Sequence, residues 1–239
     1  MDPWNKTAQK FYDEFGTKKN SAAFIKAYPK ILNRISLSFP PSPFPAHVLD
    51  LGCGTGELAL VLSEAGFQVT GVDVSKQSLV KAKEIAPAGC FLEADMTKLP
   101  VPDHSMDAVF AMTSLEFCRD KTKALQEIRR VLKPGGFFYL EVRNADFVLN
   151  VVSGKWKRFF TRTRLLKVYP AESFKDLAYE EWRSLFREAS FKIEQEYSSL
   201  RPWAYGSLLT RVKNLFIEGC KFLFPLSRQY MTAFLLRSI

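Results

Sequence analysis

Residues 48–56, Val-Leu-Asp-Leu-Gly-Cys-Gly-Thr-Gly, decide the fold, because an apolar run here ends in three glycines spaced two residues apart. A short apolar run that stops at a turn signal predicts a buried parallel strand. The glycines predict a turn tight enough for a ligand to reach the backbone. Residues 57–65 have helical composition, so the segment is a strand, a glycine loop and a helix. This is half of a nucleotide-binding βαβ unit.

The second strand of the unit follows at residues 68–73, Gln-Val-Thr-Gly-Val-Asp, and it ends in an acidic side chain 17 residues after Gly56. A carboxylate at the tip of the second strand can accept both hydroxyls of a ribose. Binding sites in open α/β sheets lie outside the carboxyl ends of the strands, which is where Asp73 is expected.

Two classes of ligand fit the glycines. Counted from Gly54, the pattern Gly54-x-Gly56-x-x-Ala59 satisfies the dinucleotide template, so a nicotinamide or flavin enzyme stays open on this criterion alone. The surroundings form a different set: a further glycine at 52, an aspartate two residues before it, and another strand that ends Phe-Leu-Glu-Ala-Asp at residues 91–95.

This set resembles class I S-adenosylmethionine-dependent methyltransferases, in particular the small-molecule branch called type 11. A helix over 120–132, then Lys-Pro-Gly-Gly at 133–136 and a strand over 137–143, is a second specific similarity. The resemblance covers residues 12–143 well and the remainder in outline. It implies an α/β fold: a Rossmann-like sheet of seven strands, mostly parallel with an antiparallel last hairpin, and helices on both faces.

The chain is long enough for one α/β domain with a full core. We expect a single methyltransferase domain over 1–239. Its expected parts are N-terminal capping helices (1–45), a cofactor-binding core (46–143), a basic aromatic lid insertion (144–177) and a C-terminal part that completes the sheet (178–239). Further strands are expected over 90–95, 106–112, 191–199 and 230–237, and further helices over 76–86 with Ser75 as the N-cap, 178–189 and 208–226.

The resemblance assigns each part of S-adenosylmethionine to residues of this chain. Asp50 supplies negative charge near the amino-acid portion, the glycine backbone donates amides, and the helix that begins at Glu57 offers its N-terminus to the carboxylate. Asp73 takes the ribose, and Asp95 accepts from the adenine amino group. The alternative for Asp95 is that it only caps the next loop. The cofactor-binding residues expected on this basis are Asp50, Gly52, Cys53, Gly54, Gly56, Asp73, Val74, Asp95, Met96 and Met112.

Methyl transfer needs a general base only if the acceptor must lose a proton. Glu116, in the loop after the fourth strand, is the best-placed base, with a helix-entry or polar packing role as the alternative. The resemblance implies that Tyr12 lies against the cofactor, and the alternative is a core aromatic whose hydroxyl meets water. His104 is expected to be exposed to solvent.

Composition limits the partners and the compartment. The formal charge is +9 and the pI is near 9.4, which favours anionic partners or serves solubility alone. Four scattered cysteines and two histidines suggest neither a metal site nor a disulfide framework. The N-terminus does not resemble a signal peptide, and no apolar run is long enough to span a membrane, so we expect a cytoplasmic protein.

Four functions remain open. The leading hypothesis is a methyltransferase that produces S-adenosyl-L-homocysteine and methylates a small, apolar or anionic acceptor. An RNA methyltransferase is the second, because basic and aromatic residues alternate over 155–167. The third is a non-catalytic binding protein of the same fold. The fourth adds peripheral membrane contact through the apolar segment 208–226.

Overall fold

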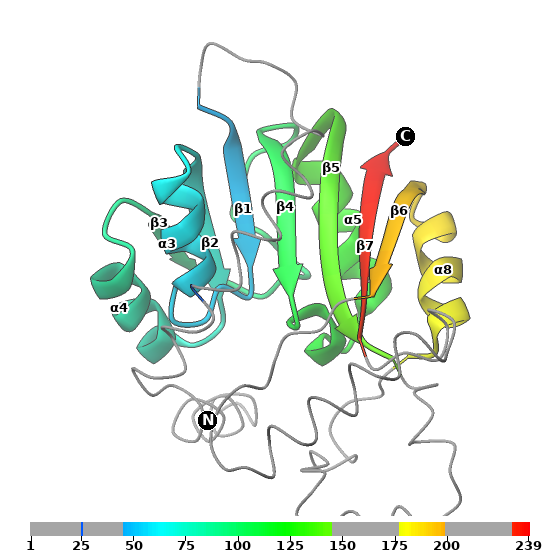
Figure 1. Ribbon diagram of the computed structural model, residues 1–239, viewed down its shortest axis with the longest axis horizontal. Coiled ribbons are helices and arrows are strands. Elements are labelled where there is room, and N and C mark those ends of the chain that lie inside the picture. The colour runs from blue at the N-terminus through cyan, green and yellow to red at the C-terminus, as the bar shows by residue number, and fades with distance from the viewer. Residues whose placement is uncertain (1–24, 26–44, 145–176, 199–230) are drawn as a thin grey trace, which may run out of the picture.

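The computed structural model describes Ile25 and residues 45–144, 177–198 and 231–239. These residues form one seven-stranded sheet in the order β3-β2-β1-β4-β5-β7-β6 (Figure 1). The strands are β1 (His47–Leu51), β2 (Gln68–Asp73), β3 (Cys90–Glu93), β4 (Met106–Met112), β5 (Leu132–Arg143), β6 (Phe191–Ser198) and β7 (Met231–Ser238).

The sheet is parallel through its first five strands and antiparallel at its last hairpin. β1 pairs in parallel with β2 and β4, β2 with β3, and β4 with β5. β7 runs antiparallel to both β5 and β6. The arrowheads of β1, β4 and β5 therefore point to the same edge in Figure 1, whereas β7 points the other way. The predicted fold class is confirmed.

Two of the helices, α4 and α5, begin at a residue whose side chain caps them. They are α3 (Glu57–Glu64), α4 (Lys76–Ile85), the short 3-10 helix η2 (Leu115–Phe117), α5 (Lys121–Val131) and α8 (Tyr179–Glu188). The side chain of Ser75 accepts from the Ser78 amide at 3.3 Å, and Asp120 accepts from the Lys123 amide at 2.9 Å. Ser75 is thus confirmed as an N-cap.

The sheet is buried on both faces, which explains the near-continuous apolar strands. On one face, Leu49, Val109 and Phe138 pack with residues of α5 and α8. On the other, Val48 and Phe110 pack with residues of α3 and α4. Ile25, which is helical, also packs against this second cluster.

β5 begins earlier than expected. Leu132 already pairs with Met106, and regular pairing then resumes at Ala108 with Phe137. The Lys-Pro-Gly-Gly segment at 133–136 therefore forms an irregularity within the strand rather than a separate turn before it. Gly135 takes a φ of 73° there, which glycine adopts without strain.

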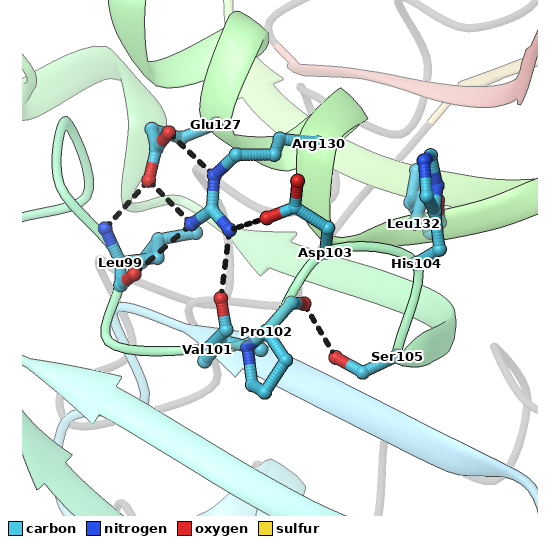
Figure 2. Close-up of polar contacts among 9 residues, drawn as sticks. All are labelled: Leu99, Val101, Pro102, Asp103, His104, Ser105, Glu127, Arg130 and Leu132. Atoms are coloured by element: carbon cyan, nitrogen blue, oxygen red, sulfur yellow. Dashed lines mark hydrogen bonds and ion pairs between the residues drawn. The ribbon is translucent and has the colours of Figure 1, made fainter.

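The connection from β3 to β4 contains no helix in the described residues between them, and one arginine holds it (Figure 2). The Arg130 guanidinium donates to the carbonyls of Leu99 and Val101 at 3.0 and 2.8 Å, and it pairs with Asp103 and Glu127 at 2.6 and 2.8 Å. Glu127 in turn accepts from the Leu99 amide. This cluster, the Arg130 network, fixes the connection to α5.

Several expectations fall on other parts of the chain. The capping helices over 1–45, the lid over 144–177 and the helix over 208–226 lie largely or wholly outside the described residues, and the proposed division of the chain stays a prediction. His104 is exposed, as expected, and its Nδ1 lies 2.9 Å from the Leu132 carbonyl. No helix among the described residues is long and apolar enough to cross a membrane.

Candidate functional site

The candidate site lies at the carboxyl ends of β1, β2 and β4, where residues 52–56 form the glycine loop. Gly52, Gly54 and Gly56 take φ values of 72°, 56° and 88°, a region that residues with a Cβ enter only with strain. Gly56 is also the N-cap of α3, and a Cβ built on it would lie 2.9 Å from Ala82 of α4. A Cβ on Gly52 would overlap Ser114. Gly52 and Gly56 are therefore required by both conformation and space, and Gly54 is required by its conformation.

The amides of these glycines already have acceptors within the protein. Gly52 and Cys53 donate to the Val72 carbonyl at 2.7 and 3.0 Å, and Gly56 donates to the Cys53 carbonyl at 3.0 Å. Gly54 donates to Asp73 Oδ2 at 3.0 Å. This differs from the expected donation of glycine amides to a ligand. The loop offers a bare backbone for close approach instead, and its amides hold its own shape.

Asp73 joins the glycine loop to the start of α4. Its Oδ2 accepts from Gly54, and its Oδ1 accepts from the Ser75 amide at 2.9 Å. Burial raises the pKa of Asp73, and the backbone hydrogen bonds from Ser75, Gly54 and Val74 oppose this rise. The side chain is half-buried, as is that of Val74 next to it. A half-buried carboxylate at a strand tip suits a ligand with a diol.

Asp50 lies in β1 just before the loop, and Cys53 lies within the loop. Asp50 is 2% exposed at the end of β1, and Cys53 is 7% exposed. Burial and then the negative charges of Asp50 and Asp73 raise the pKa of the Cys53 thiol well above its ordinary value. The thiol therefore stays protonated and unsuited to nucleophilic attack. Two carboxylates close to the loop give this edge the negative potential that a cationic group prefers.

Asp95 is exposed just after β3 and caps the following loop. Its Oδ1 accepts from the Thr97 amide and hydroxyl at 2.8 and 2.7 Å. Its Oδ2 accepts no hydrogen bond from the described residues. Met96 beside it is half-buried against the core cluster of α5. The loop-capping role is present, and the remaining oxygen leaves room for a ligand contact.

Past Met112, the exit of β4 contains Thr113 and Ser114, which were not among the expected site residues although their loop was expected to face the reacting centre. Thr113 takes a left-handed φ of 55°, and its amide donates to the Glu141 carbonyl at 2.8 Å. The hydroxyl of Ser114 donates to the Leu51 carbonyl at 2.6 Å, across 63 positions of sequence. The position of both directly after a strand was the available signal, but only the fold brings them to the glycine loop.

Glu116 is held by an ion pair. The carboxylate is 1% exposed, and its Oε1 lies 3.1 Å from Arg143 Nε at the end of β5. The Arg143 guanidinium also lies 5.2 Å from the centre of the Phe117 ring. These contacts favour the polar packing role for Glu116 over that of a general base. Tyr12, the other catalytic candidate, lies outside the described residues.

Two further features bear on the site. The part of the chain that the structure describes holds no group of three or more His, Cys, Asp or Glu that could bind a metal. A cavity of about 510 Å³ lies at the amino ends of β4 and β5, lined by His104, Arg129 and Leu132 among others. It is at the opposite end of the strands from the glycine loop and belongs to a different region.

The chain is similar to known methyltransferases in sequence. Residues 49–140 match the family model described as "Methyltransferase domain". A malonyl-[acyl-carrier protein] O-methyltransferase from Buchnera aphidicola is 35% identical over 128 residues, which cover 54% of this chain and 52% of that protein. The O-methyltransferase resE from Aspergillus sclerotiorum is 33% identical, with 65% of this chain and 58% of that protein covered. The chain spans about half the length of the first curated relatives it matches.

Solved structures share the fold of the described residues. The PH0226 protein from Pyrococcus horikoshii has a TM-score of 0.66 at 19% identity, covering 96% of this chain and 99% of that one. The [4+2]-cyclase SpnF has a TM-score of 0.62 at 21% identity, covering 89% and 81%. From its motifs, its sheet and these matches, residues 49–140 form a methyltransferase domain, and the chain is similar to class I S-adenosylmethionine-dependent methyltransferases of type 11.

Proposed function

We propose that the chain is a methyltransferase that uses S-adenosylmethionine to methylate a small acceptor and leaves S-adenosylhomocysteine as the product. One observation carries the proposal. Three left-handed glycines lie at the carboxyl end of β1, and the carboxylate of Asp73 at the tip of β2 is bonded to the middle one. This edge combines a bare backbone with negative charge, which suits a ligand that carries both a diol and a cation.

The residues fit the cofactor as follows. Gly52, Gly54 and Gly56 give the space for close approach, and Asp73 accepts from the ribose. Asp50 and the N-terminus of α3 receive the amino and carboxylate groups of the amino-acid portion. Asp95, through Oδ2, and the Met96 amide receive the adenine. Cys53, Val74 and Met112 complete the walls of the proposed site.

The cofactor, when bound, supplies an activated methyl group whose leaving group needs no proton. The protein then has to orient the acceptor and exclude water, and such positioning accounts for about 7–11 kcal/mol of a barrier. A base is needed only for an acceptor that must lose a proton. Because Glu116 is paired with Arg143, we propose that it shapes the exit of β4 and that any base comes from elsewhere.

For the acceptor we propose a small molecule or carried acyl group with an oxygen nucleophile. The names of the Buchnera and Aspergillus relatives, both O-methyltransferases, support this choice. We also propose a cytoplasmic location, with which the free thiols of Cys53, Cys90 and Cys118 agree. The RNA and membrane alternatives depend on 155–167 and 208–226, which lie outside the described residues.

Calorimetry with S-adenosylhomocysteine tests the cofactor site. Asp73→Ala should remove most of the affinity and leave the circular dichroism spectrum unchanged. Glu64→Ala is the control, since this exposed carboxylate lies at the C-terminus of α3, at the other end of that helix from the glycine loop. Wild-type protein that ignores S-adenosylhomocysteine but binds a nicotinamide dinucleotide would refute the proposal. Transfer of labelled methyl to a panel of carboxylic acids and phenols then separates an enzyme from a non-catalytic binding protein.

A further inference from the structure

We propose that Ser114 is a positioning residue that joins the exit of β4 to the tip of β1, so that the acceptor side and the cofactor side of the site keep one fixed geometry. This inference rests on the proposed methyl transfer and extends it to a residue outside the cofactor motif. The Ser114 hydroxyl donates to the Leu51 carbonyl, and its part is to hold the strands that carry the glycine loop and Asp73.

The hydrogen bond of Ser114 lies just beyond the last paired residues of β1 and β4. The paired positions of β1 and β4 end at Asp50 and Phe110. The carbonyl of the next residue, Leu51, accepts from the Ser114 hydroxyl at 2.6 Å, and the Ser114 side chain is buried. A buried carbonyl requires a donor, and here a side chain supplies it after the strand pairing has ended.

The packing of Ser114 matches the glycine loop. A Cβ on Gly52 would overlap the Cβ of Ser114, so the absence of a side chain at position 52 makes room for the serine. Gly52 therefore serves the contact between two strand tips as well as its own left-handed backbone. The same backbone position is fixed from the other side by the Gly52 and Cys53 amides, which both donate to Val72 of β2.

Thr113, immediately before the serine, is held in a conformation that a β-branched residue rarely adopts. Its φ is 55°. Such a conformation persists only when the surroundings over-determine it, and it occurs often at functional sites. The Thr113 amide is bound to Glu141 of β5 at 2.8 Å, and the next residue is bound to Leu51 of β1. The exit of β4 is thus held between its two neighbouring strands.

The Ser114 contact keeps the site in the geometry that binds the cofactor. If the exit of β4 moves away from β1, the glycine loop loses the packing against Ser114, and only a fraction of molecules remains ready to bind. The apparent dissociation constant then rises as the inverse of that fraction. Removing one buried donor of this kind should weaken cofactor affinity about 3- to 10-fold.

The experiment compares wild type, Ser114→Ala and the matched control Ser105→Ala in the full chain. The Ser105 hydroxyl also donates to a carbonyl, that of Pro102, at 2.7 Å, but it lies at the other end of β4 (Figure 2). Affinity for S-adenosylhomocysteine is measured by calorimetry, and amide hydrogen exchange is followed at Gly52, Cys53 and Thr113.

Ser114→Ala should weaken affinity about 3- to 10-fold and speed exchange at these three amides, and saturating S-adenosylhomocysteine should restore their protection. Ser105→Ala should change neither. Unchanged affinity and exchange in Ser114→Ala would overturn the inference, as would a lower unfolding midpoint with no local effect. Should the alanine variant not fold, Ser114→Cys keeps the shape with a poor donor and should show the same losses. If wild type does not bind S-adenosylhomocysteine, the proposed function fails, whereas exchange still tests the contact.

Discussion

At the scale of single residues, the glycine loop can be tested with a pair of substitutions that have almost the same backbone angle. Gly52 and Gly135 have φ values of 72° and 73°, but a Cβ at 135 would meet nothing within 4 Å, whereas one at 52 would overlap Ser114. Gly135→Ala should cost about 1–2 kcal/mol for the left-handed conformation alone.

Gly52→Ala should cost about 1–3 kcal/mol more, because overpacking is added to the same backbone strain. Urea denaturation of both variants measures the difference. Equal losses of unfolding free energy in the two variants would mean that Ser114 moves aside freely. The close packing at the tip of β1 would then contribute nothing to stability.

Asp95 caps its own loop, and we propose that its second oxygen also accepts from the adenine. Asp95→Asn should keep the loop cap, since the amide oxygen can still accept from Thr97, but it replaces the second oxygen with a donor. We expect unchanged thermal stability and a loss of S-adenosylhomocysteine affinity of about tenfold, the worth of one hydrogen bond to a charged group. Full affinity in calorimetry would leave Asp95 with its capping role alone.

At the scale of elements, the sequence predicted the strands and helices that a local pattern of residues determines. Each short apolar run became a strand, and Ser75 capped α4 as expected. The start of β5 at Leu132 escaped prediction because a pairing with Met106, far away in sequence, defines it. Thr113 and Ser114 escaped for the same reason. Their roles depend on carbonyls of β5 and β1 that no local pattern specifies.

The Arg130 network should be the main anchor of the connection between β3 and β4. Arg130→Ala leaves the Leu99 and Val101 carbonyls without their donor, and we expect a loss of about 1–3 kcal/mol in urea denaturation. Arg129→Ala is the control, because this neighbour on α5 makes one exposed hydrogen bond to the Ile239 carbonyl. It should cost less than about 0.5 kcal/mol.

The difference in unfolding free energy between wild type and Arg130→Ala should depend on pH. The hydrogen bond from Arg130 lowers the pKa of Glu127 below its ordinary value of 4.5. A lowered carboxyl pKa stabilises the folded state above that ordinary value, and the contribution is lost as the pH falls through the lowered pKa. The gap between wild type and Arg130→Ala should therefore narrow below pH 4.5. A gap that stays constant there would assign the loss to the carbonyls alone.

At the scale of the whole molecule, fold and activity separate. The same sheet occurs in a [4+2]-cyclase, so the seven strands by themselves do not specify methyl transfer. A ligand site in this chain is supported instead by the carboxylates of Asp50 and Asp73, which the sheet gathers at one edge from β1 and β2. Their common location could be predicted from the sequence, because each lies near the carboxyl end of an expected parallel strand and such ends meet at one edge of a sheet. The bonding of Asp73 to a loop amide could not be predicted, because it depends on the conformation of the turn.

Binding to this edge should stabilise the entire domain, and the effect should depend on the charge of Asp73. At a concentration of 100 times its dissociation constant, S-adenosylhomocysteine adds about 2.7 kcal/mol, which for a protein of this size raises the melting temperature by about 5–10 °C. Burial raises the pKa of Asp73, so the folded apo protein takes up a proton more readily than the unfolded chain. This group therefore lowers apo stability as the pH rises through that pKa.

The ligand-induced rise in melting temperature should change with pH in the opposite direction. It should grow with pH over the same range, because the ionised carboxylate is the better acceptor for the ribose. Differential scanning fluorimetry from pH 4 upward, with Asp73→Asn as the uncharged control, measures both trends. If the ligand-induced rise in melting temperature of wild type depends on pH no more than that of Asp73→Asn, Asp73 does not contact the ligand.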